Sequence, residues 1–230
     1  MKINAEFEKR VVVHSEEMAW VASPMAGVDR RALDRVGDEV ARATTIVRYA
    51  PNSKFSSHVH TGGEEFVVLD GVFQDEHGDF PEGSYIRNPP QSSHTPRSDD
   101  GCTIFVKLWQ FDLQDRTHVR LRTDHMAAIP HRDVPGVAVT PLYQDENENV
   151  SLQVWDANTN VRFSVPDGAE VLVLSGSLEE SGDILKKNSW LRLPVGSELN
   201  ANAGKYGAKV WLKTGHLTQV SRDISNVSNR

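Results

Sequence analysis

The chain has 230 residues and a formal net charge of −7 at pH 7, a length that allows one large domain or two small ones with a sizeable core. The acidic balance disfavours nucleic acid as a direct partner, because phosphate binding requires a clustered basic face. No apolar run reaches membrane-spanning length, the N-terminus lacks the apolar centre of a secretory signal, and the single cysteine, Cys102, forms no intrachain disulfide. We therefore expect a cytoplasmic protein without a membrane partner.

Short runs rich in Val, Ile, Leu and aromatic residues, separated by Gly, Pro, Asn and Asp, follow one another along the chain. This pattern is typical of an all-β sandwich or barrel. Residues 29–43 (DRRALDRVGDEVARA) could pass for an amphipathic helix, but Gly37 lies in their middle and the corresponding stretch 137–143 (VAVTPLY) is strand-like. We predict strands there, with Arg30 and Arg31 on a solvated face.

Two clusters of histidines are the strongest evidence of function. His58, His60 and Glu64 lie in the segment HVHTGGE (58–64), and His94 ends the segment GSYIRNPPQSSH (83–94). Side chains two residues apart on a strand project to the same face, so the first three can point together into a β-barrel. Three imidazoles and one carboxylate would hold a divalent metal ion and leave positions open for water or a ligand. A single histidine is more often a surface or packing residue, but four residues of ligand type in this order favour a metal site.

The other reactive side chains have simpler interpretations. His77, in DEHGD (75–79), is predicted in a solvated hairpin turn, and Cys102 is predicted to be packed in the core. Four aromatic residues either line a pocket or fill the core: Tyr49, Phe55, Tyr85 and Phe105. No catalytic base or nucleophile is identifiable beyond the metal set, so catalytic residues stay unassigned.

An internal repeat organises the chain. The segment EFVVLDG (65–71) reappears as EVLVLSG (170–176), and SYIRNP (84–89) reappears as SWLRLP (189–194) at the same offset. Several matches in one order at nearly one spacing predict an intrachain duplication. The predicted domains are a metal-binding domain (1–118), a degenerate copy (119–220) and a polar tail (221–230) that frays unless a neighbouring element captures it.

The second copy separates scaffold from chemistry. At the repeat offset the four ligand positions are occupied by apolar residues: Phe163, Val165, Ala169 and Leu199. Apolar replacements indicate that these positions point inward, where an unpaired charge is costly. The second domain is therefore expected to be a metal-free structural or dimerising unit, and the chain a homodimer. Glu65 has an acidic counterpart, Glu170, so spacing and the repeat both favour Glu64 over Glu65 as the ligand.

The two histidine clusters resemble the paired motifs of cupins, Gly-x5-His-x-His-x3-4-Glu-x6-Gly and Gly-x5-Pro-x-Gly-x2-His-x3-Asn. All four ligand positions match, whereas three scaffold positions depart from the pattern: Asn52, Gln91 and Ser98. Asn tolerates left-handed backbone, so its substitution for Gly is mild. Further phrases, such as GVDRR (27–31), VRYAP (47–51) and RNPP (87–90), are similar to the cupin-like domain of ChrR-type anti-sigma factors over roughly residues 15–115.

The resemblance implies two tandem jelly-roll barrels, the first binding zinc through His58, His60, Glu64 and His94. We expect one divalent ion per chain, with zinc first and Fe(II), Mn or Ni as alternatives. The sequence before the barrel lacks the helical, zinc-binding domain with which ChrR holds a sigma factor, which disfavours a sigma factor as partner. The leading hypothesis is a regulatory or stress-sensing module, and the alternative is a non-haem dioxygenase that cleaves a small diketone or hydroxyketone. A storage or carbohydrate-type cupin is a third possibility.

Overall fold

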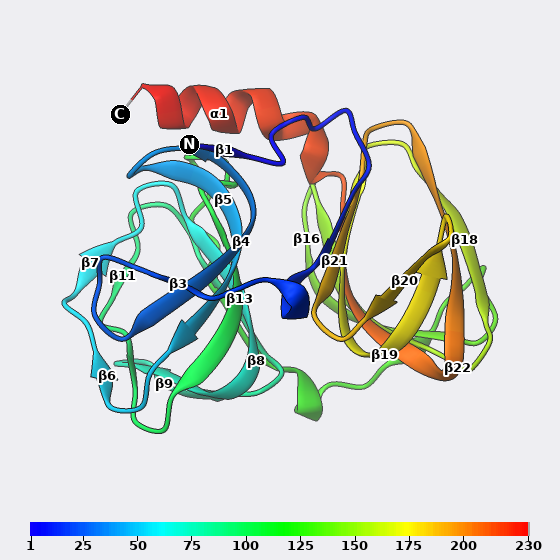
Figure 1. The fold of residues 1–230 in the computed structure, drawn as a ribbon, viewed down its shortest axis with the longest axis horizontal. Coiled ribbons are helices and arrows are strands. Elements are labelled where there is room, and N and C mark those ends of the chain that lie inside the picture. Colours follow the sequence, from blue (N-terminus) through cyan, green and yellow to red (C-terminus); the bar gives the residue numbers. More distant parts are fainter. Residues whose placement is uncertain (230) are drawn as a thin grey trace. The chain divides into compact units, whose positions relative to one another are not determined.

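The computed structural model describes residues 1–229 and consists mostly of β-strands, with one short α-helix, α1 (Val220–Ser228), in this range (Figure 1). The chain divides into two compact units. The first comprises residues 1–5, 19–125 and 221–230, and the second comprises residues 6–18 and 126–220. No helix of the described part of the chain is long and apolar enough to cross a membrane.

The first unit is organised around an antiparallel sheet of seven successive strands. Their order is β1 (Lys2–Ile3), β4 (Val28–Gly37), β5 (Ala41–Tyr49), β13 (Cys102–Leu108), β8 (Glu64–Asp75), β10 (Ser84–Asn88) and β14 (Val119–Arg122). Short strands extend this sheet: β3 (Val21–Ala22), β6 (Ser53–Lys54), β9 (Gly78–Pro81) and β12 (Arg97–Ser98). A separate two-stranded ribbon is formed by β7 (His58–Val59) and β11 (Ser93–His94), and a 3-10 turn, η2 (Thr123–His125), ends the unit.

The strand prediction for residues 29–43 is confirmed, since β4 and β5 pair from Val28↔Tyr49 to Gly37↔Ala41. Gly37 has a φ of +117°, and a Cβ atom there would lie 2.3 Å from the carbonyl oxygen of Val40. The glycine therefore makes the turn between the two strands instead of interrupting a helix.

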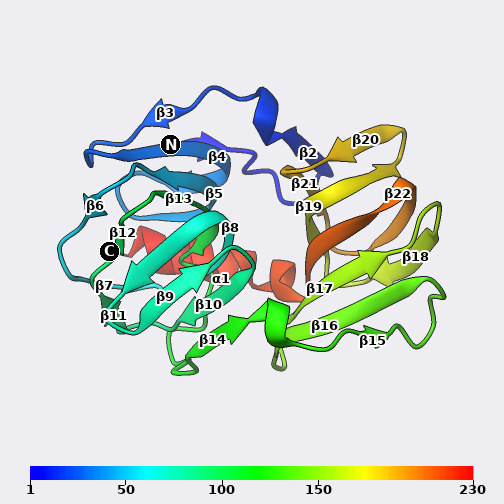
Figure 2. The same cartoon turned by 90° about the horizontal axis from the view of Figure 1, so that it is seen from below.

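The second unit contains a comparable antiparallel sheet (Figure 2). Its order is β15 (Ile129–Pro130), β16 (Val137–Gln144), β17 (Asn149–Trp155), β22 (Ser197–Thr214), β19 (Ala169–Glu180), β21 (Ser189–Leu193) and β2 (Val11–His14). Strand β18 (Asn160–Val165) pairs with β22, and β20 (Asp183–Lys186) pairs with β19. Two 3-10 turns belong to this unit, η1 (Ser15–Glu17) and η3 (His216–Gln219).

The unit boundaries differ from the predicted domains 1–118, 119–220 and 221–230. Strand β2 lies between β1 and β3 of the first unit's sheet in the chain but pairs with β21 of the second unit, with Val11 opposite Arg192. Strand β14 pairs with β10, which keeps the chain in the first unit as far as His125. Both differences arise because an edge strand offers unpaired backbone groups that a segment distant in sequence can satisfy.

The segment predicted as a fraying tail forms most of α1, apart from Arg230, which lies outside the described residues. Asp223 and Val227 are buried, and they lie on one face because four residues make about one helical turn. The Asp223 carboxylate lies 3.5 Å from the buried guanidinium of Arg42, which also lies 3.6 Å from Asp34. A buried arginine between two acids thus captures the helix within the first unit.

We predict that Asp223→Ala destabilises the protein, because it removes one acid from the buried Arg42. The expected loss of unfolding free energy is about 3 kcal/mol, measured by urea denaturation. Ser225→Ala, on the exposed face of the same helix, is the control and should leave the midpoint nearly unchanged. Equal midpoints for both variants would contradict this role of the helix.

Candidate metal centre

The ribbon of β7 and β11 brings the two histidine clusters together. His58 and His94 are paired directly across the ribbon. His60 follows in the turn, where its N–H donates to the Ser92 carbonyl at 2.8 Å and its own carbonyl accepts from the Gln91 N–H at 2.8 Å. Gln91 has a φ of +71°, so this residue adopts the left-handed backbone that the glycine of the cupin motif provides at little cost.

All four predicted ligands converge in the first unit. His58, His60 and His94 each offer a ring nitrogen, and these three atoms lie within 4.8 Å of one another. Glu64 begins β8, and its Oε2 lies 3.6 Å from the Nε2 atoms of both His60 and His94. His60, His94 and Glu64 are buried, whereas His58 is exposed.

The donor set fits a divalent cation. The Nε2 atoms of His60 and His94 are buried and have no hydrogen-bond partner. Buried polar atoms in folded proteins are nearly always paired, and a cation would serve as the common partner of these two nitrogens and the carboxylate. Three imidazoles and a carboxylate are ligands that zinc, iron, manganese and nickel all accept, which leaves the identity of the metal open.

Neighbouring groups hold these side chains in place. Nδ1 of His94 lies 3.2 Å from Oδ2 of Asp75, whose other oxygen accepts the His77 N–H at 2.7 Å. Asn88 donates from Nδ2 to Oε2 of Glu64 at 3.2 Å. Such a carboxylate–histidine pair fixes the ring so that Nε2 faces the ion.

The electrostatic environment differs between the two buried histidines. Burial lowers the pKa of His60, although Glu64 opposes this, so the neutral, metal-binding form is favoured. Burial also acts to lower the pKa of His94, but the hydrogen bond with Asp75 and the charge of Glu64 outweigh it and raise that pKa. Desolvation opposes the charge of Asp75, yet its hydrogen bonds with His94 and His77 lower its pKa below the usual value.

Glu65 points to a different environment from Glu64. Its Oε1 accepts the Tyr85 hydroxyl at 2.5 Å and lies 3.9 Å from the Arg87 guanidinium. In the second unit, Glu170 is engaged in the same way, by Trp190 Nε1 at 3.1 Å and by His216 Nε2 at 2.9 Å. The geometry therefore favours Glu64 over Glu65 as the carboxylate ligand.

A cavity of about 260 Å³ lies beside the candidate site. Three of the predicted ligands line it, His58, His60 and Glu64, together with apolar residues from β4, β5 and β13. Tyr49 and Phe55 line this cavity, whereas Tyr85 and Phe105 are buried elsewhere. A small molecule in this space would contact the residues that hold the ion.

The corresponding positions of the second unit are apolar in the structure as well. Val165, Ala169 and Leu199 are buried in its core, and Phe163 packs against that core. The described residues of this unit contain no group of three metal-binding side chains within reach of one another.

Three sequence interpretations require comment. The predicted solvated face is wrong for Arg31, which is buried with its guanidinium 4.1 Å from the Trp20 ring. Arg30 is exposed as predicted, and it also lines the cavity. His77 lies in an exposed turn as predicted. Cys102 is buried, and burial raises the pKa of its thiol to about 11, which agrees with a packing role.

Asp75 is a buried residue beside the candidate site that the sequence did not predict. The segment DEHGD (75–79) predicted a solvated turn, whereas Asp75 is the last residue of β8 and is buried. The sequence gives no sign that Asp75 contacts His94. The two residues lie on different strands, β8 and β11, which meet only in the folded protein.

Comparison with known proteins agrees with this geometry. Residues 8–112 match the family described as the ChrR Cupin-like domain. No curated protein sequence matches the chain.

Among solved structures, a protein from Nostoc punctiforme PCC 73102 that is provisionally assigned as a dioxygenase is similar with a TM-score of 0.72 and 14% identity, covering 89% of this chain and 82% of that one. The pirin YhhW from Escherichia coli in complex with nickel(II) has a TM-score of 0.63 at 12% identity, covering 90% and 98%. A cupin 2 conserved barrel domain protein from Leptotrichia buccalis has a TM-score of 0.59 at 13% identity, covering 93% and 99%. These findings support a cupin-like domain over residues 8–112 and a cupin, jelly-roll type of fold.

The adjacent glutamates provide a test of the ligand assignment. We predict that Glu64→Gln weakens metal binding, because an amide oxygen replaces a charged ligand, whereas Glu65→Gln leaves metal affinity nearly unchanged and lowers stability. Metal affinity by competition with a chelator and stability by thermal unfolding are the two measurements. A loss of metal affinity in Glu65→Gln alone would reverse the assignment.

We also predict that Asp75→Asn lowers metal affinity by about 10–100-fold, the usual effect of removing a partner that orients a ligating histidine. Asp79→Asn, in the same hairpin but exposed, is the matched control. Chelator competition on both variants measures the effect, and equal affinities would show that Asp75 does not orient His94.

Proposed function

We propose that the chain is a mononuclear metal-binding cupin in which His58, His60, Glu64 and His94 hold an ion that binds a small organic ligand. The observation that carries this proposal is the cavity lined by three of these residues. Four protein ligands close a tetrahedral zinc site, whereas an ion that accepts five or six ligands would keep positions open for a small molecule. The cavity beside His58, His60 and Glu64 would give such a molecule access to those positions, which favours chemistry on a ligand over a purely structural ion.

Metal-dependent dioxygenation of a small chelating molecule is the reaction class that we favour. A redox-active ion would supply a site for dioxygen and Lewis acidity toward the substrate. The chain would hold the ion through the four ligands, fix the ring of His94 through Asp75, and exclude water with the apolar wall of the cavity. The likeness to a protein provisionally assigned as a dioxygenase is a further support for this class.

A zinc-loaded regulatory module is the second candidate. It is favoured by the match of residues 8–112 to the ChrR Cupin-like domain. Zinc has no redox chemistry, so the ion would then position a small ligand in the cavity, and the ligand would alter contacts with a partner.

We further propose that the two units are tandem cupin barrels produced by duplication, the second without metal. Strands β8 and β10 pair with Glu64 opposite Asn88, and β19 and β21 pair with Ala169 opposite Leu193, which is the same register at the repeat offset. Gly63 and Gly168 both have a φ of +78°. A shared register and shared turn conformations are expected of two copies of one fold.

The first experiment is elemental analysis of protein purified without added metal, for which we predict about one divalent ion per chain. His60→Ala should lose most of the ion, because it removes a buried ligand. His77→Ala removes a histidine from an exposed turn and should keep it. Two ions per wild-type chain would contradict a metal-free second unit, and no ion would contradict the centre itself.

The second experiment separates the two candidates. Protein loaded with Fe(II) is mixed with a β-diketone or a hydroxyketone in an oxygen electrode, and we predict oxygen consumption that His60→Ala abolishes and His77→Ala preserves. The regulatory candidate predicts no consumption with any metal.

A further inference from the structure

Two arginines of β4 reach the same cavity as the metal ligands. Arg30 and Arg35 both line it, as does Val28 at the start of the same strand. Residues five apart would normally face opposite sides of a strand, but the pairing of β4 with β5 shifts register between Ala32 and Asp34. This bulge inserts one extra residue, so Arg30 and Arg35 lie on the cavity side of the strand, Arg30 exposed and Arg35 half-buried.

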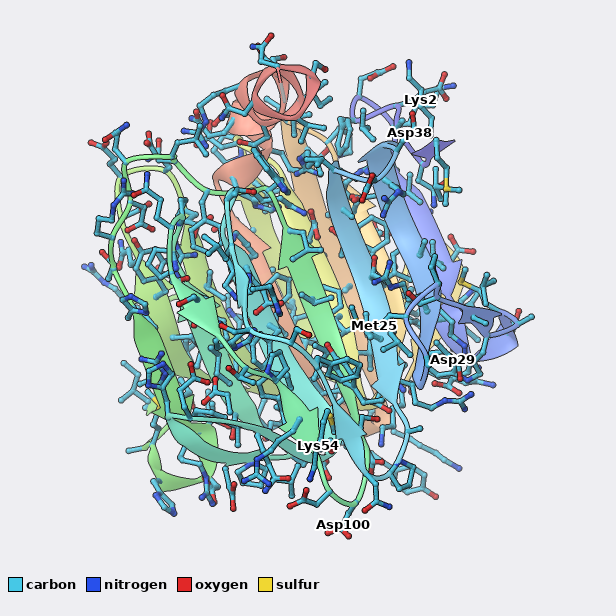
Figure 3. All side chains as sticks on the ribbon, turned by 90° about the vertical axis from the view of Figure 1, so that its left-hand side faces the viewer. Lys2, Met25, Asp29, Asp38, Lys54 and Asp100 are labelled. Atoms are coloured by element: carbon cyan, nitrogen blue, oxygen red, sulfur yellow. The ribbon has the colours of Figure 1, made fainter. Side chains whose placement is uncertain are left out.

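Neither arginine is neutralised by a carboxylate. Arg30 forms no ion pair with any described residue. Arg35 donates only to backbone carbonyls, those of Gly37 at 3.3 Å and of Asp38. The Asp38 carboxylate itself is bound to the N-terminal amine of Met1 (Figure 3 shows Asp38 beside Lys2 at that end of β4).

The two guanidiniums line one cavity, and their charges act on each other. Burial lowers the pKa of Arg35, the positive charge of Arg30 lowers it further, and the charge of Asp38 opposes both. Two like charges on one cavity wall repel, and an anion bound between them would relieve that repulsion. Among the described residues that line the cavity Glu64 is the one acid, and it faces the histidines.

We infer that the cavity binds a small organic carboxylate whose anionic head lies against Arg30 and Arg35 and whose second oxygen reaches the metal. This inference rests on the proposed metal centre and names its ligand class, a 2-oxo- or 2-hydroxycarboxylate. The guanidinium group is suited to a carboxylate because it offers parallel N–H donors. A divalent ion adds positive charge that the single carboxylate of Glu64 does not balance.

The rest of the cavity fits the hydrocarbon part of such a molecule. Its wall includes Val47, Phe55, Ile104 and Leu108, and the exposed Met25, labelled in Figure 3, also lines it. The volume of about 260 Å³ is just below the range of roughly 300–1,000 Å³ for drug-sized ligands, which limits the ligand to a small acid.

The chain also provides a matched control. Arg48 of β5 lies on the opposite face of the β4–β5 pair, where it is partly exposed and binds Asp29 at 2.7 Å. Arg48→Gln removes the same charge from the same strand pair as Arg30→Gln but does not alter the cavity. A difference between the two variants therefore reports a contact and not the net charge of the protein.

The experiment is calorimetric titration of Ni(II)-loaded protein, whose metal content is first measured, with benzoylformate and with its neutral amide. We expect benzoylformate to bind about tenfold or more tightly than the amide, because a charged hydrogen bond is lost with the amide. Arg30→Gln should remove most of that preference, Arg30→Lys should restore part of it, and Arg48→Gln should keep it. Arg35→Gln tests the second guanidinium in the same way.

The outcomes separate this inference from the metal centre. Equal binding of acid and amide by metal-loaded wild-type protein, or an unchanged preference in both Arg30→Gln and Arg35→Gln, overturns the carboxylate site while the ion remains bound. A preference for the acid in protein that retains no metal supports the arginine site and overturns the metal centre.

Discussion

The burial of two imidazole nitrogens without hydrogen-bond partners is the constraint on which the first unit depends. Nε2 of His60 and of His94 are both removed from water and both face Oε2 of Glu64. Leaving a buried polar group unsatisfied costs about 1–3 kcal/mol, and a cation between the side chains would remove that cost at both nitrogens. The arrangement therefore favours an ion in place of water as the partner of the two histidines.

Backbone conformation makes that convergence possible at a few positions. A Cβ atom on Gly62 would lie 2.0 Å from the Trp109 ring, so only glycine lets the turn after His60 approach the cavity wall. Asn52 and Gln91 adopt left-handed φ values of 60° and 71°, in place of the glycines of the cupin pattern. These departures from the pattern therefore preserve the backbone, because Asn tolerates this region and the ribbon hydrogen bonds hold Gln91 there.

The sequence allowed prediction of features that depend on a few neighbouring residues, but not of features that depend on pairing between distant segments. The histidine spacing, the turn at Gly37 and the left-handed Asn52 follow from rules that act within a few residues. The interleaving of the chain ends between the units does not, because any exposed strand edge could have accepted β2. Arg31 was misread for a related reason, because its burial depends on contact with Trp20, which lies eleven residues earlier in the chain. A bulge, which no local pattern predicts, likewise decides which face Arg35 takes.

The second unit helps to distinguish structural charges from chemical ones. A row of charges crosses three strands of the first sheet, Arg87–Glu65–Lys107, and the same row recurs as Arg192–Glu170–Lys213. The three side chains of the row are buried in each unit, although the second unit has apolar residues at every ligand position. Because the row persists where the ligands do not, its ion pairs and hydrogen bonds serve the sheet. The candidate ligands have no such counterpart in the second unit. On strand β8 this difference favours Glu64 as the metal ligand and Glu65 as part of the structural row of charges.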